Sequence, residues 1–514
     1  MGTVLEPILM GTNQACYPAI VGGNRPRMHS GCTGFASAFA GYVRCHAVKV
    51  ATCDKMLFTG DISVTPGQCE TMSEEIELKF IIHPDAAASI RQGLKSWQSD
   101  VGHSNHLHTH QLANSYYETA DGYLRQHGIG LRIRGENGRY EMTVKTAGKV
   151  VGGLHQHPEY NVSLPAPQLD IHLLPPEIWP EGCDIEALSQ AVQPLFSTDF
   201  QREAWVVSHH QSLIEIAVDQ GEIRAGECSE PLCELELELK NGRVADLLAF
   251  ANELADIGGL RQGSLSKAAR GYHLAKGNPV RPCHELTFLP VEPKMTLDQG
   301  IAAGLEHAFS HWQYHEELWA RGDATARPAL LEAGAMMREL LVLIGGVVPR
   351  KVTAEFRAAL GHLEEAIERT ETADTLCYSV DYLKDKLILT SWLVKQGWRN
   401  YMDNRELMRL QSSWKRFADI MMSRGLAELK AVFSHSLDAL HYTQQLPRLQ
   451  RGVYTFLLLG GSYPQEEATR YLQPWRELMQ LIESLSVGQV VPGMLENSRK
   501  QALAQPPFWL HSGQ

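Results

Sequence analysis

Charged side chains recur at every second position in several short runs of the sequence. Alternate residues of a β-strand share one face, so Glu75, Glu77 and Lys79 would project together while the apolar residues between them face the other way. The other runs with this spacing contain Arg132 and Arg134; Glu141, Thr143 and Lys145; Glu215 and Asp219; and Glu234, Glu236 and Glu238. Each run therefore predicts a strand with one charged face and one apolar face.

The chemistry of these faces depends on where they point. Three carboxylates in a row, such as Glu234, Glu236 and Glu238, repel one another unless a metal ion or a basic partner lies nearby. If the sheet closes with its charged faces inward, carboxylates can bind hard divalent ions, and Arg and Lys side chains can bind phosphate oxygens. This arrangement predicts a cavity for a metal-bound polyphosphate. The periodicity is also compatible with charges outside and a plain apolar core inside, although recurrence on five strands favours the first arrangement.

The elements that would position these residues follow from the hydrophobic patterns. Period-two alternation predicts strands at 75–82, 130–134, 140–145, 160–164, 204–207, 213–219 and 233–239. Helical patterns lie between them at 84–97, 184–192 and 242–257. The fold class predicted for this half is α+β with one antiparallel sheet.

Strand signals end after a proline-containing segment at 279–293. Apolar residues then recur at helical spacing through 297–321, 329–344, 351–369, 381–399, 406–422, 425–433 and 474–485. The second half is therefore predicted to be all helical.

The first 71 residues differ in texture from the rest of the chain. They hold half of the 10 cysteines and mix Gly, Pro, Ser and Thr with no sustained period. We expect a disordered or spurious leader at 1–71, an α+β domain at 72–278, a linker at 279–293, a helical domain at 294–500 and a tail at 501–514.

Composition excludes several other classes of protein. The formal net charge of -12 argues against a nucleic-acid scaffold, and no apolar run reaches the roughly 18 residues that a membrane-spanning helix needs. The cysteines form no CxxC pair, so we expect free thiols in a cytoplasmic protein. Neither GxxxxGK[ST] nor a GxGxxG after a strand occurs, so nucleotide binding of those two kinds is not predicted.

The run Glu75-Ile-Glu77-Leu-Lys79 resembles the ExExK signature of the CYTH superfamily, whose members include class IV adenylyl cyclases, thiamine triphosphatases and inorganic triphosphatases. The resemblance covers about residues 72–272. It continues through Arg132, Arg134, Lys145, Asp219, Glu234, Glu236 and Ser266-Lys267. The helical half resembles a CHAD domain, and the combination is most similar to the bacterial two-domain inorganic triphosphatases.

The resemblance implies an eight-stranded antiparallel tunnel barrel that binds a triphosphate along its axis. The phosphate-binding cations that it implies are Lys79, Arg132, Arg134, Lys145, Arg202 and Lys267. The metal-holding acids are Glu75, Glu77, Asp219, Glu234 and Glu236, with Glu159 in support, and the catalytic group is Glu75, Glu77 and Lys79. The expected reaction is hydrolysis of tripolyphosphate to diphosphate and phosphate with Mg²⁺ or Mn²⁺.

Two alternatives stay open. Within the same fold, the chain could be a class IV adenylyl cyclase or a thiamine triphosphatase. In another class, it could be a non-catalytic polyphosphate-binding protein that uses its helical half. That half departs from the CHAD pattern, because its stretch 330–340 carries one Arg and no His, so we expect at most a weak polyphosphate surface or a protein-interaction surface.

Overall fold

The computed structural model describes residues 72–100, 108–487 and 492–510. The chain divides into two units, 1–62 and 63–514, and the described residues all lie in the second. The predicted leader at 1–71 and the last residues of the predicted tail lie outside the described residues.

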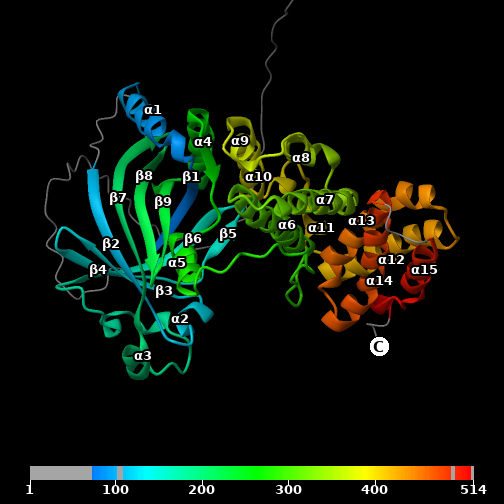
Figure 1. The fold of residues 1–514 in the computed structure, drawn as a ribbon, viewed down its shortest axis with the longest axis horizontal. Coiled ribbons are helices and arrows are strands. Elements are labelled where there is room, and N and C mark those ends of the chain that lie inside the picture. The colour runs from blue at the N-terminus through cyan, green and yellow to red at the C-terminus, as the bar shows by residue number, and fades with distance from the viewer. Residues whose placement is uncertain (1–71, 101–107, 488–491, 511–514) are drawn as a thin grey trace, which may run out of the picture. The chain divides into compact units, whose positions relative to one another are not determined.

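The first half of the described chain is a closed antiparallel barrel (Figure 1). Its strands are β1 (Ser73–Ile82), β2 (His108–Glu118), β3 (Gly130–Glu136), β4 (Arg139–Lys145), β6 (Leu154–Leu164), β7 (Gln193–His209), β8 (Ser212–Ala225) and β9 (Cys228–Asn241). They are ordered β1-β9-β8-β7-β2-β3-β4-β6, and β6 pairs with β1 to close the ring of eight. Two short strands extend the sheet: β5 (Lys149–Val151) pairs with β6, and β10 (Leu260–Gln262) pairs with β1. The predicted eight-stranded barrel is confirmed.

The apolar faces of the strands point out of the barrel and are covered by helices. Leu78 and Phe80 of β1 and Leu237 of β9 are fully buried in one cluster with apolar residues of α1 (Ala87–Asp100) and α4 (Val244–Leu254). A second cluster buries the outer faces of β3, β4 and β6 against α2 (Tyr123–Gln126) and α3 (Ile185–Ala191). The charged faces of the strands therefore point into the barrel. The alternative prediction, with the charges outside and an apolar core inside, is wrong.

Helix α5 (Lys267–Ala275) packs against inward-facing residues of the barrel. Ser266 caps its first turn by accepting a hydrogen bond from the Ala269 amide at 3.1 Å. The approach is close, because a Cβ on Gly271 would lie 2.2 Å from the Phe196 ring. Helix α5 thus places its first residue, Lys267, inside the barrel.

The second half of the described chain is helical, as predicted (Figure 1). Its α-helices are α6 (Leu297–Ala320), α7 (Arg327–Leu343), α8 (Ala354–Arg369), α9 (Ala373–Cys377), α10 (Val380–Val394), α11 (Asn404–Leu410), α12 (Trp414–Phe433), α13 (Ala439–Gly460), α14 (Gln465–Glu483) and α15 (Pro492–Ala504). Among the described helices, none combines the length and apolar character needed to cross a membrane.

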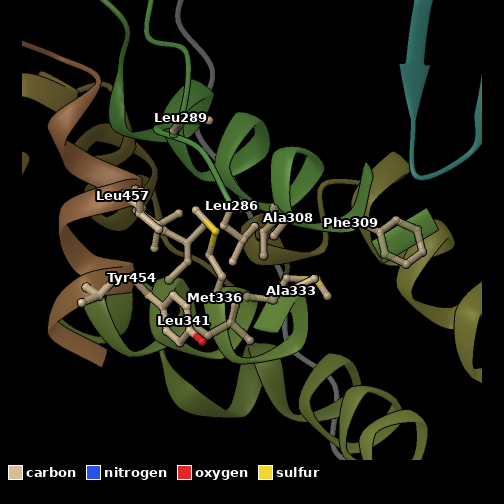
Figure 2. Close-up of a cluster of buried hydrophobic side chains, with 14 of the residues drawn as sticks. Leu286, Leu289, Ala308, Phe309, Ala333, Met336, Leu341, Tyr454 and Leu457 are labelled. Carbon is tan, nitrogen blue, oxygen red and sulfur yellow. The ribbon is translucent and has the colours of Figure 1, made fainter. Parts of the chain in front are cut away.

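The helical core also includes the segment predicted as a linker. Leu286 and Leu289 are 2% and 1% exposed, and they pack among residues of α6, α7 and α13 (Figure 2). The Leu289 amide donates a hydrogen bond to the Leu457 carbonyl at 2.9 Å. Trp509, in the segment predicted as a tail, is 3% exposed in the same core. Residues at both edges of the predicted helical domain therefore contribute to its packing.

A buried ion pair joins α6 to α10 inside the helical half. The Lys386 ammonium contacts the Glu316 carboxylate, and each side chain is 1% exposed. A buried charge that loses its partner is strongly destabilising, whereas an apolar replacement of both partners often costs little.

We expect Lys386→Met to lower the unfolding free energy by about 3–5 kcal/mol, because it leaves the Glu316 carboxylate buried and unpaired. The double variant Lys386→Met with Glu316→Gln should recover most of that loss. Urea unfolding of the two variants and the wild type measures both effects. A single variant within 1 kcal/mol of wild type, about the value of an exposed pair, would contradict the expectation.

Candidate functional site

The interior of the barrel holds a cavity of about 710 Å³. All eight barrel strands and α5 contribute to its lining. The carboxylates in the lining are Glu75, Glu77, Glu141, Glu159, Glu215, Glu236 and Glu238. The cations are Lys79, Arg132, Arg134, Lys145, Arg202, Lys240 and Lys267. Acidic and basic groups are thus equal in number, and the structure brings most of the predicted site residues together here.

Exposure along the strands distinguishes a floor from a mouth. On β9, Glu234 is 0% exposed and Glu236 is 8% exposed, Glu238 is partly exposed and Lys240 is exposed. The same gradient runs along β1 from the buried Lys79 to the exposed Ser73. Asp219 and Glu234, the two predicted site acids outside the cavity lining, are fully buried at the floor.

Lys267 lies among three carboxylates at the floor. Its Nζ is 2.7 Å from Asp219, 2.5 Å from Glu234 and 2.9 Å from Glu236. The carboxylate oxygens of these three residues lie within 4.8 Å of one another, a spacing that suits a metal ion. Here the ammonium occupies their centre. Although burial alone lowers the pKa of Lys267, the three carboxylates raise it above its usual value, so the lysine is charged.

Strand register places two further cations in contact with Glu236. Lys79 lies opposite it on β1, and Lys79 Nζ is 2.5 Å from Glu236 and 2.9 Å from Glu77. Arg202 lies opposite Asp219 on β7 and donates two hydrogen bonds of 2.7 Å to it and one of 2.7 Å to Glu236. Burial raises the pKa of Glu236, but Lys267, Lys79 and Arg202 together hold it well below the usual range.

The opposite wall, on β3 and β4, is less completely neutralised. Arg132 lies 3.8 Å from Glu159, and Lys145 pairs with Glu75. Arg134 donates a hydrogen bond from Nε to Asn114 Oδ1 at 3.0 Å, and Glu141 lies opposite it on β4. Burial and the positive charges of Arg132 and Arg202 lower the pKa of Arg134 to about 10. This guanidinium is thus charged, and the neighbouring positive charges outweigh the attraction of Glu141.

Four polar lining residues on β2 and β6 were not singled out from the sequence as site residues. Tyr116 accepts a hydrogen bond from Arg132 at 3.5 Å, and although burial raises its pKa, Arg132 lowers it on balance. Burial and the neighbouring Lys79 lower the pKa of His155 to about 4, so its imidazole is neutral at pH 7. The other two are His157 and Asn161. The alternation of side chains along a strand could have identified His155, His157 and Asn161, since they share the face of Glu159 on β6.

Comparisons with known families agree with this architecture. Residues 73–272 match the family model of the CYTH domain, and residues 303–495 match that of the CHAD domain. The first match spans the barrel and all but the end of α5, and the second lies in the helical half.

A curated relative and several solved structures are similar to parts of the chain. An inorganic triphosphatase from Haemophilus influenzae is 42% identical over 204 residues, which are 40% of this chain and 55% of that protein. This chain therefore matches about half the length of that relative.

Two solved structures have low overall scores. A putative adenylyl cyclase from Hippeastrum, described as having a dominant triphosphatase activity, is 23% identical, with 40% of this chain and 97% of that chain covered and a TM-score of 0.30. The CHAD domain from Ricinus communis is 15% identical, with 44% and 92% covered and a TM-score of 0.28. The family matches and the barrel geometry together identify this chain as a CYTH domain followed by a CHAD domain.

Proposed function

We propose that this chain hydrolyses inorganic tripolyphosphate to diphosphate and phosphate inside the CYTH barrel, with a divalent cation bound alongside the substrate. The observation that carries the proposal is Arg134, a buried, charged guanidinium that faces the cavity, where burial and the charges of Arg132 and Arg202 outweigh the attraction of Tyr116 and Glu141 and lower its pKa. A bound anion would offset this excess of positive charge. The similarity to an inorganic triphosphatase supports the same substrate class.

The cavity favours a short, charge-dense substrate over a nucleotide. Charged groups line it from floor to mouth, so each phosphate of a linear triphosphate gains cation contacts. The Tyr116 ring already stacks on Phe196 with centroids 4.4 Å apart, which covers one of its faces. A nucleoside would add bulk with few groups to recognise it, so the adenylyl cyclase and thiamine triphosphatase alternatives are less well supported.

The donor set suits a hard divalent cation. The lining is neutral overall, so a polyanion entering it brings excess negative charge that the paired lysines and arginines do not offset. Glu75, Glu77 and Glu236 present carboxylates to the cavity and would hold Mg²⁺ or Mn²⁺ there. Asp219 and Glu234 face Lys267 instead, and we assign them to holding that lysine. When bound, the cation would neutralise phosphate oxygens and make a bound water more acidic.

Two groups of cationic side chains would bind the phosphates from opposite walls of the cavity. Lys79, Arg202 and Lys267 form a rigid cationic floor, fixed by their ion pairs to Glu236 and Asp219. Arg132, Arg134 and Lys145 present charge from the opposite wall, where they can follow the phosphate chain. Both walls stabilise the charge that develops on the leaving diphosphate. Hydrolysis also needs a water in line with the scissile phosphorus, which the polar lining can hydrogen-bond.

In the helical half, the stretch 330–340 offers little for polyphosphate. Arg338, the arginine in the stretch 330–340, is ion-paired with Glu364, whose side chain is 17% exposed. A cation that is already paired contributes less to binding a further anion. The non-catalytic polyphosphate-binding alternative therefore has less support than catalysis in the barrel.

A substrate panel tests the reaction type. We expect kcat/KM for tripolyphosphate to exceed that for ATP by at least roughly tenfold, or about 1.4 kcal/mol in transition-state binding. Phosphorus NMR should show diphosphate and phosphate in equal amounts. Cyclic AMP as the main product from ATP would favour the adenylyl cyclase alternative. Thiamine triphosphate as the best substrate would favour the thiamine triphosphatase alternative.

The metal assignment is tested by binding rather than by turnover. Calorimetry of Mn²⁺ with the chelator-treated protein should show an affinity that Glu77→Gln weakens by at least roughly tenfold, because one charged ligand is lost. The matched control is Glu203→Gln, since Glu203 pairs with Arg91 and is not part of the cavity lining. Equal affinities in the two variants would remove Glu77 from the metal site.

Arg134 and Arg202 should have opposite effects on the stability of the ligand-free protein. A guanidinium whose pKa is lower in the folded state than in the unfolded state destabilises the fold at neutral pH, so Arg134→Met should raise the unfolding free energy by about 1 kcal/mol or more. Arg202→Met should lower it, because Asp219 and Glu236 lose a partner. Thermal unfolding with and without tripolyphosphate measures both, and ligand stabilisation should shrink in both variants. Destabilisation by Arg134→Met would show that its charge is satisfied without ligand.

A further inference from the structure

A continuous chain of ion pairs leads from the tunnel floor out to helix α6 of the CHAD domain. It begins at Glu234, which contacts Lys267 at 2.5 Å and Arg270 at 3.3 Å. Arg270 Nε donates to Glu230 at 2.6 Å, and Arg321 donates to the same Glu230 oxygen at 2.9 Å. Arg321 directly follows α6, so this helix contributes to a network that ends inside the barrel.

The outer end of this network is anchored by a second carboxylate. Arg321 Nε donates to Glu317 Oε1 at 2.6 Å, and Arg261 lies 2.7 Å from the other Glu317 oxygen. The Arg261 and Glu317 side chains are 3% and 5% exposed. Burial raises the pKa of Glu317, but the two arginines lower it on balance to about 2. Glu317 is therefore charged, and it fixes the Arg321 guanidinium next to Glu230.

The network acts on the helix that carries Lys267. Arg270 lies one turn after Lys267 on α5, and its guanidinium also donates to the Pro231 carbonyl at 2.6 Å. Glu230 and Glu234 both belong to β9, so Arg270 binds α5 to that strand at two points. Arg321 restrains Glu230 from the CHAD side. The orientation of α5, and with it the place of Lys267 among the floor carboxylates, thus depends on a residue outside the CYTH domain.

A second contact shows that the CHAD domain holds the barrel at more than one place. The backbone of Gly152, in the turn between β5 and β6, donates to Glu306 at 2.6 Å and accepts from Thr390 Oγ1 at 2.6 Å. Gly152 has a φ of +58°, and a Cβ there would lie 3.0 Å from the Thr390 backbone. In addition, Leu383 and Leu387 of α10 are buried in the same cluster as Leu78 of β1.

We propose that the CHAD domain completes the triphosphate site from outside the barrel, with Glu317 and Arg321 as positioning residues that hold Lys267 through Glu230 and Arg270. This inference rests on the proposed function for its substrate. It assigns the fused helical domain a task in the reaction that needs no polyphosphate site of its own.

The test compares two arginines with the same exposure. Arg321 and Arg338 are each 38% exposed, and their partners Glu230 and Glu364 are 14% and 17% exposed. Arg321→Met should lower kcat/KM for tripolyphosphate roughly tenfold, because small misplacements of binding groups are costly in catalysis. Arg338→Met should stay within about twofold of wild type, and Arg321→Lys should recover part of the loss because it restores the charge.

A second measurement separates positioning from general destabilisation. Hydrogen exchange of the full chain is followed with and without diimidotriphosphate, an analogue that resists hydrolysis. Binding in the barrel should slow exchange at the end of α6 near Arg321 in the wild type and in Arg338→Met, since coupling between two sites is reciprocal. In Arg321→Met this protection should disappear from α6 while it persists on the barrel strands.

The outcomes distinguish the two proposals. If the wild type binds the analogue and protects α6 but does not hydrolyse tripolyphosphate, the proposed reaction fails and the coupling stands. Equal losses of activity in Arg321→Met and Arg338→Met, or α6 protection that survives in Arg321→Met, would overturn the positioning role. Absence of any binding in the barrel would overturn both.

Discussion

A charge inside a closed barrel is stable only when an opposite charge lies in contact with it, because removal from water costs several kcal/mol per ion. This constraint organises the CYTH domain. Glu236 is contacted by Lys79, Lys267 and Arg202, and each of those cations contacts at least one further carboxylate. The ligand-free interior is therefore nearly self-neutralised. Positive charge is in excess around Arg134, and a polyanion is attracted there.

The inward direction of the charged faces also explains why helices must cover the outside of the barrel. Strands that turn their charged face inward must turn their apolar face outward, and that face has to be buried by other elements. Helices α1 and α4 cover part of it, and α10 of the CHAD domain adds Leu383 and Leu387 to the same cluster. The CHAD domain is thus part of the packing of the barrel wall, and its fusion to the CYTH domain has a structural reason.

Local pattern predicted most of the architecture, and its failures have identifiable causes. The seven predicted strands all fall within observed ones, but β2 was not included among them, since its polar and aromatic residues give a weak alternation. The predicted helix at 406–422 is interrupted, because Asp403 and Ser413 each provide an N-cap and so start separate helices. Helix α13 was not predicted, and it contains Pro447, a residue that usually signals a helix end.

Site residues were predictable by type and parity, but their partners were not. Parity placed Asp219, Glu234 and Glu236 on inward faces, where acids that bind a metal and acids that hold a lysine look alike in sequence. The difference arises from α5, which returns Lys267 into the barrel from a position far along the chain. Likewise, the hydrogen bond from Arg134 to Asn114 depends on the register of β2 and β3, which the sequence pattern does not give.

The distribution of neutralised charge also gives the tunnel a direction. At the floor, Lys267 is a covalently attached cation that pairs with the fully buried Asp219 and Glu234. Toward the mouth, Glu75 and Glu238 are partly exposed and pair with Lys145 and Lys240. Exposed ion pairs are weak and screened by salt, whereas buried pairs are screened much less. An anion that enters the barrel therefore meets the most easily rearranged charges first and the most firmly held charges last.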